Sequence, residues 1–176
     1  MTVLVDPARV AALPRLEAFD RLPSEAAARS LAQCCAARRW VTALAAGRPY
    51  GSVDALYEAA GRQLAALEWP DVREALAAQP RLERWIGGLE LARAATAYEA
   101  KFGFVFLIRT PGRDPGQLLK ACRDRLGHDE LTEQPAVRGE LAQVVRLRLD
   151  RMLARLDPAP DPADGPRRSR DDWGAA

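Results

Sequence analysis

An arginine stands where an apolar residue is expected near the end of the sequence. From about Pro135 to Leu156 apolar side chains recur with helical spacing, and Arg148 falls near the middle of that stripe. A buried guanidinium is costly unless it is paired. Either its stem packs while its charge reaches solvent or a buried carboxylate, or its planar fork is aimed at the carboxylate of a ligand. Arg146 and Arg151 are predicted to point away as surface side chains.

A short apolar segment is the second feature that could form a site. In "YEAKFGFVFLIRT", residues 98–110, five consecutive apolar residues follow Gly103, which is predicted to end a helix. Such a run has to be buried. It is either a central buried helix or strand, or a non-helical backbone whose N–H groups can point at a ligand.

Composition excludes several classes of function. The net charge of +2 gives no field that would attract nucleic acid or an anionic membrane. No apolar run approaches the roughly 18 residues that span a bilayer, and the first residues lack the pattern of a signal peptide. Three cysteines without ligand spacing and a single histidine, His128, predict no metal site and no disulfide framework. Buried thiols in a cytoplasmic protein are therefore expected.

The elements that position these residues are predicted to be helices. Periodicity favours an all-α, single-domain bundle of about six to eight helices, with residues 104–108 as an exception. Ser24 and Ser52 are predicted to cap helices at their N-termini. Asp71 and Glu74 resemble a capping box that opens a short helix, which has to end near Gln79 because Pro80 follows.

The remaining boundaries follow from similar signals. Apolar residues between positions 82 and 86 predict another helical face, and the run from 89 to 102 predicts a helix that Gly103 ends. Asp114 and Pro115 predict a helix start, and Gly127 its end. The last helix is predicted from about Pro135. The expected organisation is an extension over 1–16, a helical domain over 17–157 and a disordered tail over 158–176.

Removing the proline-rich, charged tail after Asp157 is expected to leave the melting temperature nearly unchanged. Its composition offers too little apolar area to offset the entropy lost on ordering. Thermal denaturation of the full chain and of the truncated chain checks this, and a large drop would contradict it.

Several motifs together resemble the 2-oxo-4-hydroxy-4-carboxy-5-ureidoimidazoline (OHCU) decarboxylases. Tyr98 and the run from Lys101 to Phe104 match an aromatic residue, a basic residue and Phe-Gly-Phe. An Arg-Leu-Gly motif at 125–127, with Glu133 close by, and Arg-Leu at 148–149 follow in the same order. The N-terminal half agrees more loosely, through "LPSEAAARSLAQCC", a tryptophan at 40 and "RPY" at 48–50. The resemblance covers roughly residues 17–156.

This resemblance implies an all-α enzyme that needs no metal or cofactor and is commonly a homodimer. The family removes CO2 from OHCU to give (S)-allantoin, the last step from urate. It uses a histidine followed by proline, a glutamate on the next helix, backbone N–H groups after Phe-Gly-Phe and an arginine on the last helix. The residues implied to bind substrate are Pro80, Phe106, Leu107, Ile108, Arg109, Thr110 and Arg148.

The sequence departs from the family where proton transfer is expected. The histidine position is occupied by Gln79, and an amide neither donates nor accepts a proton as an acid or base near neutral pH. The stretch between Pro80 and Phe102 is shorter than in the family and lacks its Ser-x-x-Glu-Gln motif. His128 occupies the family's usual asparagine position and is not a substitute. The catalytic residues are therefore left unassigned.

Three hypotheses remain. The chain is an active decarboxylase with an altered acid–base group, a homologue that binds a related ureido or imidazoline ligand without efficient chemistry, or a helical scaffold for a protein partner. Arg148 and the Phe-Gly-Phe segment favour the first two. Decarboxylation of OHCU to (S)-allantoin is the function predicted from the family.

Overall fold

The computed structural model describes residues 7–81 and 88–157, with side chains from residue 13 onward, and these ranges hold eight α-helices and no strand. The prediction of an all-α fold is therefore confirmed. None of the described helices is long and apolar enough to cross a membrane. The helices are α1 (Pro7–Arg21), α2 (Ser24–Cys34), α3 (Arg38–Ala46), α4 (Val53–Ala65), α5 (Trp69–Ala77), α6 (Leu89–Phe102), α7 (Pro115–Leu126) and α8 (Glu130–Ala154).

The N-terminal helices pack around aromatic residues. α3 contacts both α2 and α4, and α1 contacts α4. Trp40 of α3 is fully buried, and its indole N–H donates to the Ala60 carbonyl of α4 at 3.1 Å. Arg48, after α3, donates to the carbonyls of Phe19 and Leu22 at 2.9 and 2.7 Å. These bonds tie the turn that follows α3 to the end of α1.

Helices α6 and α7 pack on each other and flank the apolar segment. Gly103 ends α6 in the left-handed conformation, with φ of 75°, which a glycine adopts without the steric cost of a Cβ. The Asp114 carboxylate accepts from the Gln117 N–H at 2.8 Å and caps α7, whose C-terminal cap is Gly127. The boundaries predicted at these residues are confirmed. Residues 105–110 between the two helices are neither helix nor strand.

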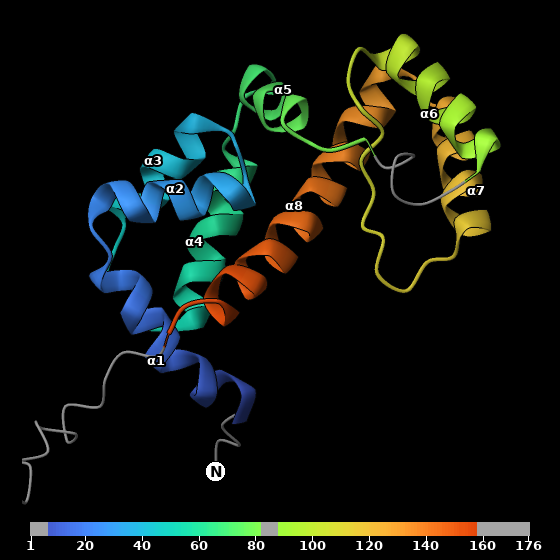
Figure 1. Cartoon of the computed structure of the whole chain (residues 1–176). Coiled ribbons are helices and arrows are strands. Elements are labelled where there is room, and N and C mark those ends of the chain that lie inside the picture. Colours follow the sequence, from blue (N-terminus) through green and yellow to red (C-terminus); the bar gives the residue numbers. More distant parts are fainter. Residues whose placement is uncertain (1–6, 82–87, 158–176) are drawn as a thin grey trace, which may run out of the picture.

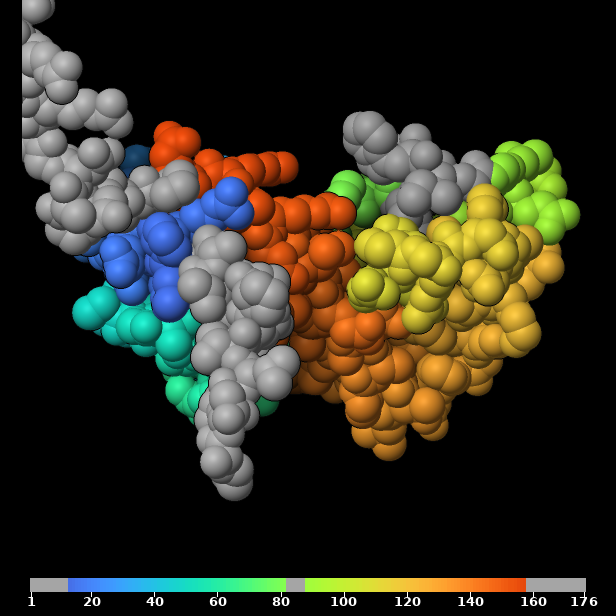
Figure 2. All heavy atoms as spheres, turned by 90° about the horizontal axis from the view of Figure 1, so that it is seen from below, coloured from blue at the N-terminus to red at the C-terminus, as the bar shows by residue number. Residues whose placement is uncertain are grey.

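Helix α8 connects two groups of helices, which are α1 to α4 and the pair α6 and α7 (Figure 1). Its C-terminal part contacts α1, α2 and α4, and its N-terminal part lies beside α6 and α7 in the view. Figure 2 shows the orange atoms of α8 between the blue and cyan N-terminal helices and the yellow segment before α7. The residues of α8 that are buried recur at helical spacing: Glu133, Val137, Leu141, Val145, Leu149 and Leu153.

Of three predicted helix starts, one is confirmed and two are wrong. Ser52 caps α4 as predicted, because its hydroxyl accepts from the Ala55 N–H at 3.1 Å. The prediction for Ser24 is wrong: Pro23 is the cap residue, and no side chain caps α2. The long helix starts at Glu130 rather than Pro135, because the Asp129 carboxylate caps it through the Thr132 N–H at 2.8 Å.

Helix α5 also starts earlier than the sequence pattern indicated. It begins at Trp69, and the Asp71 carboxylate accepts from the Glu68 backbone N–H at 3.2 Å. The predicted pairing of Asp71 with Glu74 is therefore wrong, although the helix ends before Gln79 as expected. Helix α1 continues across the expected boundary between 16 and 17. The predicted helical face at 82–86 and the tail beyond 157 lie outside the described residues.

Candidate functional site

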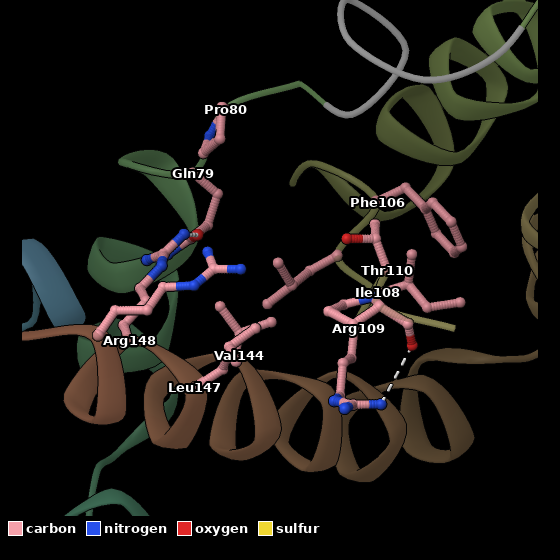
Figure 3. A pocket seen from close by; sticks show the side chains of 12 residues that line it. Gln79, Pro80, Phe106, Ile108, Arg109, Thr110, Val144, Leu147 and Arg148 are labelled. Carbon is pink, nitrogen blue, oxygen red and sulfur yellow. Dashed lines mark hydrogen bonds between the residues drawn. The ribbon is translucent and has the colours of Figure 1, made fainter. Parts of the chain in front are cut away.

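A cavity of about 160 Å³ lies where three elements meet: the end of α5, the segment before α7 and the middle of α8 (Figure 3). Every residue predicted to bind substrate lines this cavity, and so does Gln79. The structure thus brings together residues that are far apart in the sequence. The full lining is Gln79, Pro80, Phe106, Leu107, Ile108, Arg109, Thr110, Pro111, Val144, Leu147, Arg148 and Arg151.

Gln79 is held firmly at the end of α5. Its side-chain amide N–H donates to the Ala75 carbonyl at 2.9 Å, and its backbone N–H donates to the Leu76 carbonyl at 3.0 Å. The residue is only 6% exposed. Pro80 follows and prevents the helix from continuing. The Gln79 amide oxygen therefore faces the cavity from a fixed position (Figure 3).

Arg148 lies inward from α8 and meets neutral acceptors. Its guanidinium donates to the Gln79 amide oxygen at 2.6 Å and to the Cys34 carbonyl at 3.2 Å. Burial lowers the pKa of this guanidinium. Within residues 7–81 and 88–157 no carboxylate forms an ion pair with it, so the interpretation of a buried carboxylate partner does not hold there. Its charge is therefore available to an anionic ligand.

Phe106 and Ile108 line the same cavity, and their side chains point away from Arg148 (Figure 3). They are 4% and 5% exposed, so the segment is buried as predicted. Because its backbone is neither helix nor strand, the alternative of a central helix or strand is wrong. The Arg109 N–H does not point at a ligand, because it donates to the Glu140 carboxylate at 2.7 Å. This bond fastens the segment to α8.

A buried polar cluster also holds the apolar segment before α7, through the carbonyl of Leu107. Arg125 donates to the Leu107 carbonyl at 2.7 Å and to the Glu133 carboxylate at 2.8 Å. The Tyr98 hydroxyl also donates to Glu133, and the His128 imidazole lies 2.8 Å from its second oxygen. Glu133 is fully buried. Burial alone would raise the pKa of Glu133, but the bonds from Arg125 and Tyr98 lower it overall.

None of the described side chains that line the cavity is suited to transfer a proton near neutral pH. The lining contains arginines, a glutamine and a threonine as its polar side chains, but no aspartate, glutamate, histidine, lysine or tyrosine. His128 is engaged with Glu133 and does not line the cavity. No group of three or more potential metal ligands occurs among the described residues. The described residues of the cavity can bind an anion, whereas none of them offers an acid or base for proton transfer.

Some lining residues were not predicted from the sequence. Arg151 was expected to point away as a surface side chain; it is exposed as predicted, but it also lines the cavity. Val144 lies one turn before Arg148, and that spacing could have identified it. Glu140 anchors the segment from outside the cavity, and no local pattern in the sequence indicated that role.

A family model described as OHCU decarboxylase matches residues 20–85 and 88–150, which is more than half of the chain. The chain belongs to the OHCU decarboxylase family. No curated protein matches the chain in sequence. The match to the family extends from α1 almost to the end of α8 and includes every residue that lines the cavity except Arg151.

Two solved structures share the fold of this OHCU decarboxylase family member. The crystal structure of (S)-allantoin synthase aligns with a TM-score of 0.65 and 18% identity over 78% of this chain and 53% of that one. This chain thus spans about half of that structure. The structure of an OHCU decarboxylase in the presence of (S)-allantoin aligns with a TM-score of 0.62 and 24% identity, over 70% of this chain and 96% of that one.

Proposed function

We propose that this protein decarboxylates OHCU to (S)-allantoin in urate catabolism. Family membership supports a decarboxylase, and one observation carries the assignment of the site. Arg148 is half-buried, bonded to neutral acceptors, and lines the cavity together with the segment that carries Phe106 and Ile108. A cation in that setting suits a small, planar, anionic ligand. The substrate-binding residues that we propose are Pro80, Phe106, Leu107, Ile108, Arg109, Thr110 and Arg148.

The proposed chemistry assigns Arg148 to the charge that forms during the reaction. The bond between the carboxyl carbon and the ring carbon breaks, CO2 leaves, and the electron pair stays on the ureido-imidazoline ring. A fixed guanidinium stabilises such developing negative charge without reorganising. A proton then adds to the ring from one face, which sets the configuration of allantoin. The Gln79 amide can donate or accept a hydrogen bond in this step but cannot supply the proton.

A second candidate function is ligand binding without efficient chemistry. The observation that favours it is the described lining, which has no group that titrates near neutral pH. The two functions share the same cavity and the same ligand class. They differ in turnover, so the initial rate of chiral allantoin formation from freshly generated OHCU, compared with the spontaneous background, separates them.

Replacing Arg148 with glutamine is expected to weaken (S)-allantoin binding by about 10–100-fold, since charge-assisted hydrogen bonds are lost. Isothermal titration calorimetry measures the change. The matched control is Arg93→Gln, which removes the same charge from an exposed position on α6 that does not line the cavity. Equal affinities in the two variants would contradict the assignment of Arg148.

The quaternary structure and the compartment stay predictions. A homodimer and a cytoplasmic location are expected from the family and the composition. A protein partner, the third hypothesis, stays a prediction as well. Sedimentation of the purified chain tests the dimer directly.

A further inference from the structure

A second cavity, of about 320 Å³, adjoins the first on the other side of Arg148. It lies between α2 and the last turns of α8, which contact each other. One guanidinium nitrogen of Arg148 bonds to Cys34, which lines the second cavity, and the other bonds to Gln79, which lines the first. The second cavity is lined by Ser30, Gln33, Cys34, Arg148, Arg151, Met152, Arg155 and Leu156.

Positive charge is concentrated on one wall of this cavity. Arg148, Arg151 and Arg155 are spaced by three and four residues, which places them on one face of the helix. None of the described residues that line the cavity carries a carboxylate. In the described ranges, none of these arginines forms an ion pair, whereas Arg146 of the same helix pairs with Asp150 at 3.6 Å. The wall therefore carries positive charge that no described side chain neutralises.

The arginines also repel one another. Like charges at this spacing on a helix are unfavourable, and the charge of Arg151 adds to burial in lowering the pKa of the Arg148 guanidinium. An anion placed between them would be attracted to each guanidinium and would offset that repulsion. Binding of a negatively charged ligand in this cavity is therefore electrostatically favourable.

The other lining residues fit the same kind of ligand. Burial raises the pKa of the Cys34 thiol to about 12, so no thiolate competes for the arginines near neutral pH. The Ser30 hydroxyl already donates to the Ala26 carbonyl at 2.9 Å. The donors that remain are the guanidinium groups and the Gln33 amide. Guanidinium forks match the oxygen pairs of carboxylates and phosphates.

We propose that this second cavity is a binding site for a small oxyanion, a carboxylate or a phosphate, held by Arg155 together with Arg148 and Arg151, which line both cavities. Arg155 and Gln33 line the second cavity but not the first, so a change at either residue tests the second cavity without touching the proposed decarboxylation site. Binding can therefore be measured whether or not the protein turns over OHCU.

Calorimetric titration of the full-length chain with inorganic phosphate, and separately with malonate, tests the proposal at low ionic strength. We expect saturable binding of at least one of them, and we expect Arg155→Gln to weaken it by about tenfold or more, since at least one charge-assisted contact is lost. The control Arg93→Gln removes the same charge from α6 and should leave the affinity unchanged. The two titrants distinguish phosphate from carboxylate as the preferred group.

Two results would overturn the proposal. One is the absence of saturable heat with either anion. The other is an equal loss of affinity in Arg155→Gln and Arg93→Gln, which would mean that the anions respond to net charge rather than to the cavity. Titration of Arg155→Gln with (S)-allantoin provides a check on the fold, because Arg155 lies outside the first cavity and that binding should persist.

Discussion

Replacing Gln79 with histidine is expected to raise the initial rate of (S)-allantoin formation by a factor of about 10²–10⁴, which is the usual contribution of general acid–base catalysis. Gln79 lies at the fixed end of α5, bonded to Arg148, and faces the cavity. Histidine at that position supplies a group whose ordinary pKa of about 6.5 suits proton transfer near neutral pH. The described lining of the cavity otherwise lacks such a group.

The measurement is the initial rate of chiral product in the wild type and in Gln79→His, each against the spontaneous background. Gln79→Asn keeps a neutral amide and should not accelerate the reaction. Gln143→His adds a histidine at an exposed position of α8 outside the cavity and controls for an incidental base. A wild type that is already fast and stereospecific would show that the proton comes from elsewhere. An unchanged rate in Gln79→His, with allantoin still bound, would show that a second catalytic group is also missing.

Replacing Glu133 with glutamine is expected to lower the free energy of unfolding by about 3–5 kcal/mol at neutral pH, because it leaves a buried charge without its partner. Arg125 is 8% exposed, and Glu133 is its counter-ion within the described residues. Because Arg125 also holds the Leu107 carbonyl, the change should loosen the segment that lines the cavity. Chemical denaturation measures the loss, and Glu90→Gln, which breaks the exposed pair with Arg123, should have little effect.

The same variant should change how stability depends on pH. The pKa of Glu133 is lowered in the folded protein, so its contribution is present in full above the ordinary glutamate value of about 4.3 and is lost as the pH falls through the folded value. The wild type and Glu133→Gln should therefore differ most near neutral pH and converge in acid. A constant difference across that range would mean that the carboxylate is not the source of the stability.

Local signals in the sequence identified several helix ends because each depends on residues close together. Gly103 adopts the left-handed conformation that ends α6, and Asp114 caps α7 with its side chain. Both features can be predicted from a few neighbouring residues. The start of α8 was placed too late because Pro135 resembles a first-turn residue. Asp129 was the better signal, since its carboxylate reaches the Thr132 N–H, and the proline is accommodated inside the helix.

Helical periodicity and the family motifs predicted which residues form the candidate site, but not how those residues contact one another. The inward position of Arg148 follows from its place on the apolar stripe of α8. Its partners do not, because Cys34 and Gln79 belong to other elements and meet it through tertiary packing. The contribution of Arg151 to the cavity lining was missed because a helical wheel gives the direction of the Cβ rather than the end of a long side chain.

Helix α8 fixes the spacing of three anchors along one rigid axis. Glu133 holds Arg125, Glu140 holds the Arg109 N–H, and Arg148 lines the cavity further along the same helix. Inserting or deleting a single residue between Glu133 and Arg148 would turn one end against the other by about 100° and shift it by about 1.5 Å. Such a change would misalign Arg148 with the two glutamates that hold the segment, whatever residue were added. The site therefore constrains the length of α8 between Glu133 and Arg148.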